Sequence, residues 1–190
     1  FIRQSGGRGQ FGDVTLRIEP LEAGEGLVFE SEITGATLPT EYFKPVEQGF
    51  KEAAQSGVVA GHPVVDIKAV LIDGSHHEVD SSEVAFKIAA SMAFKDACQK
   101  ASPFILEPVM LMEVVTPEEF LGDVLGDLQS RRAQVQSMDA QTGLQIIKAF
   151  VPLAETFQYA TILRSNTTGR ASFSQELDHY APAPMIKKEA

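Results

Sequence analysis

The chain has 190 residues, of which 44% are hydrophobic, and it carries a formal net charge of −10 at pH 7. Its uncharged runs are far shorter than the roughly 18 residues of a membrane span, and one cysteine excludes a disulfide framework and a cysteine-based zinc site. The acidic charge argues against a general nucleic-acid binder, which is usually basic, so any RNA contact must be made by a small local patch.

The first distinctive stretch is the glycine-rich sequence SGGRGQFG at residues 5–12. Its glycines match the pattern G-x-G-x-x-G, but that nucleotide-binding fingerprint requires a strand before it and a helix after it. Here residues 14–19 alternate between apolar and polar side chains, which predicts a half-buried strand. We therefore expect a flexible loop that brings Arg8, Gly9 and Gln10 close to a partner.

Four further elements are predicted in the first half of the chain. A strand at residues 27–34 follows the glycine-rich turn 22–26, which favours a hairpin with the preceding strand. Then come a helix at 44–56, a strand at 64–72 and a helix at 82–101. This β-β-α-β-α order predicts an α+β domain over residues 1–104, a small sheet covered by helices in the manner of a ribosomal-protein-like βαβ domain.

The polar loop DGSHHEVDSSE at residues 73–83 joins that strand to the last helix. Asp80 and Glu83 fit a capping box, in which Asp80 accepts from the N–H of Glu83 and Glu83 reaches back to the N–H of Asp80. Such a cap would anchor the loop and leave an exposed tip, formed by Ser75, His76, His77 and Glu78.

The two histidines of this loop support several interpretations. Hydrogen bonding to RNA, or stacking on its bases, is the leading hypothesis. Solvated loop histidines and a catalytic role near neutral pH stay as alternatives. A metal site is disfavoured, because adjacent side chains diverge and no cysteine is near.

The second half, residues 105–181, predicts a ferredoxin-like plait. Its helix at 118–132 begins at the sequence TPEE, where Thr116 suits the N-cap and proline the first helical position. A second helix is expected at 153–165, and strands are expected at 108–115, 133–138, 144–151 and 171–180. This β-α-β-β-α-β order is that of the split βαβ fold. Residues 182–190 are expected to form a C-terminal tail.

These motifs together resemble elongation factor G, specifically its two C-terminal domains, the fourth and the fifth. The stretches that carry the resemblance run in the order of the family over nearly the whole chain. They are SGGRGQFG at 5–12, AGHPVVD at 60–66, VDSSEVAFK at 79–87, LEP at 106–108, GDVLGDL at 122–128, YATILRS at 159–165 and TGRAS at 168–172.

The resemblance implies the ribosome-contacting arm of a GTP-driven translation factor. The fourth domain of such factors reaches the decoding centre, where its tip contacts tRNA and mRNA; the matching residues are Arg8, Gly9, Gln10, Ser75, His76, His77 and Glu78. The fifth domain lies against ribosomal RNA of the large subunit near the stalk base. The residues expected to face its phosphates are Arg131, Arg132, Arg164 and Arg170, whose guanidiniums offer fixed forks for phosphate oxygens. For Arg131 and Arg132, a favourable position at a helix end is also a sufficient explanation.

A phosphate-binding G-x-x-x-x-G-K-[ST] loop is absent from the sequence, so this chain is expected neither to bind nor to hydrolyse GTP. GTP and Mg²⁺ would belong to an N-terminal part of a longer parent. Because the chain opens on Phe1 rather than on methionine, we expect it to be a fragment of that parent. We further expect a cytoplasmic monomer, in which the lone cysteine stays reduced.

Two features depart from the family pattern. His76 stands where these factors usually carry an aromatic residue before the tip histidine, and the tail lacks a clear amphipathic helix. A paralogue that recycles ribosomes after termination is therefore an alternative function. A free-standing enzyme that uses the histidine loop, with the plait as a regulatory domain, is a more remote one.

Overall fold

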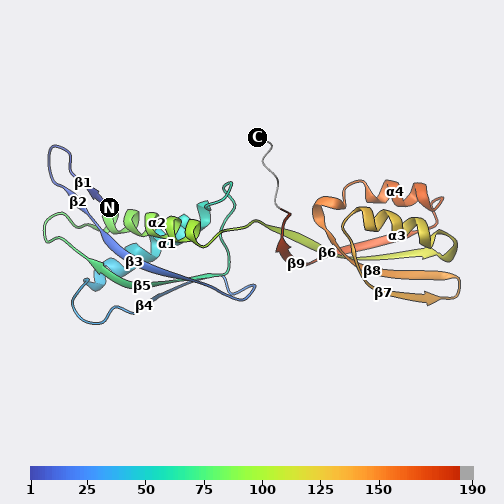
Figure 1. Ribbon diagram of the computed structural model, residues 1–190, viewed down its shortest axis with the longest axis horizontal. Helices are drawn as coiled ribbons and strands as arrows, with labels where there is room; N and C mark the ends of the chain where they lie inside the picture. Colours follow the sequence, from blue (N-terminus) through green and yellow to red (C-terminus); the bar gives the residue numbers. More distant parts are fainter. Residues whose placement is uncertain (185–190) are drawn as a thin grey trace. The chain divides into compact units, whose positions relative to one another are not determined.

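The computed structural model describes residues 1–184, which form two compact α+β units that divide between Phe104 and Ile105 (Figure 1). The predicted tail at 182–190 falls largely outside the described residues, and the last strand reaches its first residue, Pro182.

The sheet of the first unit has three strands, in the order β3 (Asp13–Pro20), β5 (Ile67–Ser75) and β4 (Leu27–Ser31). The central strand β5 is antiparallel to β3 and parallel to β4. The predicted hairpin between β3 and β4 is therefore wrong, because β5 lies between them. The strand expected at 64–72 also begins and ends three residues later, so that its end reaches Ser75.

The connection between β3 and β4 is held by one carboxylate at the start of β5. Oδ1 of Asp66 accepts hydrogen bonds from the backbone N–H groups of Gly24, at 3.1 Å, and Gly26, at 2.9 Å. Asp66 itself has a φ of 54°, a left-handed conformation that aspartate tolerates better than most residues. This contact fastens the glycine-rich turn to the start of β5, the strand that separates β3 from β4.

Two helices pack on this sheet, α1 (Phe43–Ser56), which follows a short 3₁₀ turn at Thr40–Tyr42, and α2 (Glu83–Lys100). Because α1 connects the parallel strands β4 and β5, these three elements form the expected βαβ unit. Apolar side chains of both helices are buried against the strands, among them Phe50, Ala54, Phe86 and Phe94 from the helices and Ala69 and Leu71 from β5.

The glycine-rich stretch forms a small hairpin of its own. The strand β1 (Ile2–Arg3) pairs antiparallel with β2 (Gln10–Phe11), and residues 4–9 form the loop between them. The hairpin sits close to α2, since a Cβ on the buried Gly12 would lie 2.7 Å from the carbonyl oxygen of Ala85. Only glycine permits this approach.

The predicted capping box of Asp80 and Glu83 is also wrong. The N-cap of α2 is Ser82, whose backbone is extended and whose hydroxyl accepts from the N–H of Ala85 at 3.2 Å. Glu83 is already the first helical residue, and Asp80 lies two positions before the cap. The sequence DSSE offers two capping residues in a row, and the structure uses the second.

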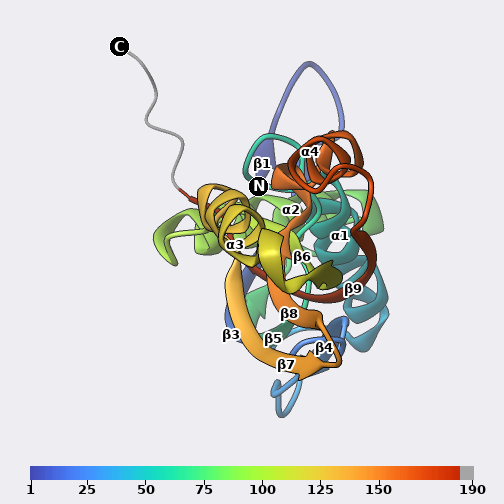
Figure 2. The ribbon, with the colours of Figure 1, turned by 90° about the vertical axis from the view of Figure 1, so that its right-hand side faces the viewer.

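The second unit contains a four-stranded antiparallel sheet in the order β7-β8-β6-β9, which is the ferredoxin-like topology. Its strands are β6 (Leu106–Pro117), β7 (Gln134–Gln141), β8 (Leu144–Pro152) and β9 (Ser172–Pro182). The helices α3 (Leu121–Ser130) and α4 (Tyr159–Asn166) lie on the same side of the sheet (Figure 2). The core between them includes Met112, Val114, Ile147, Leu128 and Tyr159.

Both helices of this unit begin later than predicted. Each is preceded by a 3₁₀ turn, Glu118–Phe120 before α3 and Leu153–Glu155 before α4. Thr116 is not an N-cap, because it is a buried residue of β6. The second helix is further delayed by Gln158, whose φ of 61° interrupts the helical path.

Candidate nucleic-acid interface

The glycine-rich hairpin and the histidine loop lie together in the first unit, although about 70 residues separate them in the sequence. The N–H of Phe11 donates to the carbonyl oxygen of Asp80 at 2.9 Å, and the Ser81 hydroxyl donates to the carbonyl oxygen of Phe11 at 3.0 Å. From the loop of the hairpin, Arg8 donates twice to the carbonyl oxygen of Val79, from Nε at 3.1 Å and from Nη2 at 3.0 Å. We call this assembly, residues 4–11 and 75–81, the paired-loop tip.

His77 lies in the turn that the hairpin contacts, and its imidazole is fixed by that turn. Nδ1 accepts from the backbone N–H groups of Val79, at 3.3 Å, and Asp80, at 3.2 Å. The His77 side chain remains 54% exposed. Its other nitrogen, Nε2, is therefore the one available to a partner.

His76 has a different neighbourhood. Its ring lies 6.4 Å from that of Tyr42, which in turn stacks on Phe86 with ring centroids 4.2 Å apart. The Tyr42 hydroxyl has a pKa above its usual value, because the ring is desolvated and Glu41 and Glu83 are close. His76 thus lies beside an aromatic pair that continues into the core.

Three of the remaining predicted tip residues lie in the hairpin or the histidine loop, and the fourth lies at the end of a strand. Gln10 belongs to β2, Glu78 is exposed, and Gly9 packs so closely on Asp80 that a Cβ would meet its Oδ2 at 2.9 Å. Ser75, which was expected in the loop, is the last residue of β5, and its hydroxyl donates to Oδ2 of Asp13 at 2.6 Å.

Sequence reasoning missed Ser81 as a member of this site. Its hydroxyl accepts from the N–H of His77 at 2.8 Å while it donates to Phe11, so it joins both loops. The signal was present in the sequence, because a serine four residues after His77 can close such a turn. It was overlooked when the polar run was interpreted only as a helix cap.

The four arginines predicted to face RNA lie in the second unit, and three of them pair with carboxylates of that unit. Arg131, whose side chain is 15% exposed, donates from Nε to Asp127 at 2.8 Å and from Nη1 to the carbonyl oxygen of Glu155 at 2.6 Å. Its guanidinium also lies over the Tyr159 ring, 5.0 Å from the centroid. Arg132 forms a two-pronged pair with Glu107, at 2.9 and 3.2 Å, which raises the pKa of the guanidinium.

The other two arginines are more accessible. Arg164 is exposed in the last turn of α4, and its side chain makes no hydrogen bond or ion pair with any residue between 1 and 184. Arg170 is also exposed; it pairs with Glu119 and lies over the Phe120 ring at 5.7 Å.

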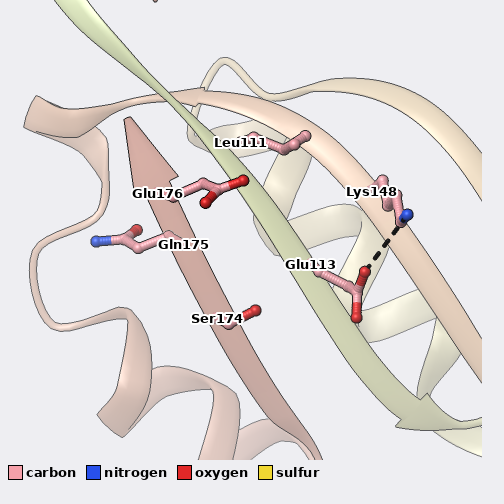
Figure 3. Close-up of a pocket in the computed structure, with 6 residues that line it drawn as sticks. All are labelled: Leu111, Glu113, Lys148, Ser174, Gln175 and Glu176. Carbon is pink, nitrogen blue, oxygen red and sulfur yellow. Dashed lines mark ion pairs between the residues drawn. The ribbon is translucent and has the colours of Figure 1, made fainter. Parts of the chain in front are cut away.

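The face of the plait that lies opposite α3 and α4 carries a shallow hollow of about 280 Å³ (Figure 3). Glu113 and Lys148 form an ion pair of 3.6 Å across it, and Leu111, Ser174, Gln175 and Glu176 complete its lining. The hollow is open and predominantly acidic, so it does not favour a phosphate.

Within residues 1–184, no group of three or more metal-ligating side chains comes together. In the same part of the chain, no helix has the length and apolar character needed to cross a bilayer.

Two α+β units in this order, the first carrying a paired-loop tip and the second a ferredoxin-like plait, match two family models that describe domains of a translation elongation factor. The chain belongs to the elongation factor G family. The family model described as elongation factor G, domain IV, matches residues 1–102, and that described as elongation factor G C-terminus matches residues 104–190. Neither is a GTPase domain.

The chain is also similar in fold and sequence to a solved structure. The chain is 46% identical to a protein of known crystal structure from Thermus thermophilus, with a TM-score of 0.81 over 97% of the chain. The match covers 27% of that protein, so the chain spans about a quarter of its length.

Proposed function

We propose that the chain is the ribosome-contacting arm of a GTP-dependent translocase, which inserts the paired-loop tip beside tRNA and mRNA as they advance by one codon. Membership of the elongation factor G family supports this proposal. The observation that carries it furthest is the tip itself, in which two loops distant in sequence are hydrogen-bonded into one surface that exposes His76 and His77. A rigid surface of this kind acts by binding and steric exclusion, without covalent chemistry.

For the second unit, we propose that Arg164 and Arg170 contact phosphates of ribosomal RNA at the stalk base of the large subunit. Both guanidiniums are exposed, and an arginine fork suits phosphate oxygens. Arg131 and Arg132 contribute in another way, because both donate to Glu155 and so brace the segment that leads into α4.

In the parent protein, GTP and Mg²⁺ would be bound outside this chain, and hydrolysis there would drive the arm as a monomer in the cytoplasm. The arm supplies contacts to RNA, and the rest of the protein supplies the energy.

The translocation proposal is tested by toeprinting pre-translocation ribosomes with the intact factor and GTP, comparing His77 with the His77→Ala variant. We expect a one-codon advance that the variant slows by roughly tenfold or more, as the loss of one well-placed hydrogen bond predicts. No advance with the unmodified factor, in an assay where a known translocase succeeds, would refute translocation. Splitting of post-termination ribosomes by the same preparation would then favour the recycling alternative.

The arginine proposal is tested by ribosome binding at several salt concentrations. Arg164→Glu and Arg170→Glu should each weaken binding, and each lost phosphate contact should lower the slope of log K against log salt by about one. Lys148→Glu is the matched control, since it reverses an exposed charge on the opposite face of the same sheet. Equal effects from all three variants would show that net charge, rather than these two contacts, governs binding.

A further inference from the structure

We propose that the paired-loop tip holds His77 in a single tautomer, with the proton on Nε2, and that Arg8 and Ser81 are the positioning residues that maintain it. The tip would then present one fixed hydrogen-bond donor to an acceptor atom on RNA. The identity of the partner rests on the proposed function, whereas the tautomer and its positioning rest on the geometry alone.

The tautomer follows from the two backbone groups that face Nδ1. The N–H groups of Val79 and Asp80 both point at this nitrogen, at 3.3 and 3.2 Å, and an N–H can donate only to a lone pair. Nδ1 is therefore unprotonated, and the ring proton of the neutral imidazole resides on Nε2. The Asp80 carboxylate lies 3.7 Å from Nδ1, which is beyond hydrogen-bond length, and it does not compete with the two amides.

The position of the ring follows from Ser81, which closes the turn around it. The Ser81 hydroxyl accepts from the N–H of His77 at 2.8 Å, and the N–H of Ser81 donates to the carbonyl oxygen of His77 at 3.1 Å. The hydroxyl has one proton, and this proton is given to Phe11 in the neighbouring hairpin. Both ends of the turn are thus tied to each other and to a second strand.

Arg8 fastens the middle of the same turn. Two of its N–H groups converge on the carbonyl oxygen of Val79 and so hold the peptide plane that also carries the N–H of Asp80, one of the two donors to His77. The Phe11 ring is also a neighbour of the imidazole, with ring centroids 6.3 Å apart at an angle of 52°. Arg8 thus has a role inside the tip, and its predicted contact with a partner stays a prediction.

This arrangement limits the chemistry of His77. The lone pair on Nδ1 already accepts two backbone hydrogen bonds, so the neutral ring cannot accept a proton from a substrate as a general base. The enzymatic alternative thereby loses its best candidate. An outward Nε2–H instead requires an acceptor. Phosphate oxygens, ribose hydroxyls and base carbonyls are all acceptors of this kind. An RNA segment that is unpaired, or whose backbone is exposed, provides them.

The tautomer is tested on the 190-residue chain by ¹⁵N NMR of labelled histidine, with His77→Asn used to assign the resonances. We expect Nδ1 of His77 to resonate as an unprotonated nitrogen and Nε2 as a protonated one. Arg8→Ala and Ser81→Ala should each make the second tautomer detectable, whereas Arg3→Ala, in the same hairpin, should leave the spectrum unchanged. A proton mainly on Nδ1, or a spectrum that neither variant alters while backbone resonances report an intact fold, would overturn the proposal.

The consequence for function is tested with the intact factor in the toeprint assay. As a clamp on one carbonyl oxygen, Arg8 should be replaced by lysine no better than by alanine, both slowing the advance by roughly tenfold to a hundredfold, because misplacement of a contacting group is costly. A direct phosphate contact would instead tolerate Arg8→Lys, and that result would contradict the clamp. His77→Gln, whose amide nitrogen can stand in for Nε2–H, should retain more activity than His77→Asn. If the factor does not translocate at all, the NMR result still decides the tautomer, so failure of the proposed function and failure of this inference remain distinguishable.

Discussion

Replacing Gly49 with alanine should destabilise the first unit, although alanine is the better helix former. Gly49 lies inside α1, where this helix crosses α2, and a Cβ there would lie 2.2 Å from the carbonyl oxygen of Lys87 and 3.1 Å from the Cβ of Ala90. To bring the first contact from 2.2 Å to 3.4 Å, the helices would have to separate by about 1.2 Å. A backbone oxygen cannot rotate away from the added methyl group, so the whole helix pair must move.

The magnitude follows from two opposing effects. Overpacking a core typically costs about 1–3 kcal/mol, and occasionally more, whereas alanine gains about 1 kcal/mol over glycine in a helix interior. The displacement here is large and is shared by Phe50 and Phe94, which are both buried below the crossing. We therefore expect a net loss of about 2 kcal/mol, which corresponds to a fall of roughly 10 °C in the Tm of a unit of this size.

The matched control is Gly126→Ala in α3 of the second unit. Gly126 is also inside a helix, but beyond the neighbouring backbone of that helix no atom lies within 4 Å of the position that a Cβ would take there. Only the helix propensity should therefore change, and stability should rise by up to about 1 kcal/mol. Urea unfolding followed by amide hydrogen exchange assigns each effect to its own unit. If both variants are stabilised alike, α1 and α2 do not approach as closely as the structure shows.

Substitutions at three further positions test contacts within the two units. Asp66→Ala removes the acceptor of the Gly24 and Gly26 amides and should lower the free energy of unfolding of the first unit by about 1–3 kcal/mol in urea titrations. Asp66→Asn should cost much less, because asparagine keeps an oxygen and tolerates the left-handed backbone. Tyr159→Phe removes a buried hydroxyl that has no hydrogen-bond partner within residues 1–184, so the second unit should become about 1 kcal/mol more stable, the reverse of the usual loss. Burial raises the pKa of that phenol, so the unmodified unit should lose stability as the pH rises above about 10, where unfolded tyrosine ionises. When unfolding is measured at several alkaline pH values, the free energy of unfolding of the variant should depend less on pH. Hydrogen bonds from Arg17 lower the pKa of Glu19 and Glu32. The stability that these two carboxylates contribute is therefore present above pH 4.5 and is lost as the pH falls below it. In an acid titration, Arg17→Met should lose less of its free energy of unfolding than the unmodified chain.

Periodicity in the sequence predicted the helices and strands of both units well, because each of these elements buries one face. The alternation at residues 14–19 became β3, and the helix predicted at residues 44–56 became α1. Strand pairing was predicted correctly in the plait, where the order of the elements resembles a known split βαβ fold. In the first unit the hairpin failed, because the strand that pairs with both β3 and β4 is β5, which lies about 40 residues further along the chain.

The candidate site shows the same division between local and distant information. The loops that carry Arg8 and His77 could be found from their composition, but their union could not, since it depends on hydrogen bonds across about 70 residues. The sequence also could not show that Arg131 is turned inward, because Asp127 one turn earlier is compatible with either a solvated or a bridging pair. Ser81 and Ser82 are adjacent and chemically identical, and only the position of the hairpin distinguishes the one that joins the loops from the one that caps α2.

The charge of the chain and its proposed contact with RNA become compatible once the pairing of its basic groups is considered. Most lysine and arginine side chains within residues 1–184 form ion pairs with carboxylates, including Arg17, Lys51, Lys68, Lys87, Lys100, Arg131, Arg132, Lys148 and Arg170. A surface neutralised in this way releases few counterions when it meets RNA, so it has little sequence-independent affinity. Specific contact must then come from donors whose direction is fixed in advance, and the paired-loop tip supplies one in His77. On the proposed function, this acidic arm recognises RNA by the geometry of a few contacts rather than by its net charge.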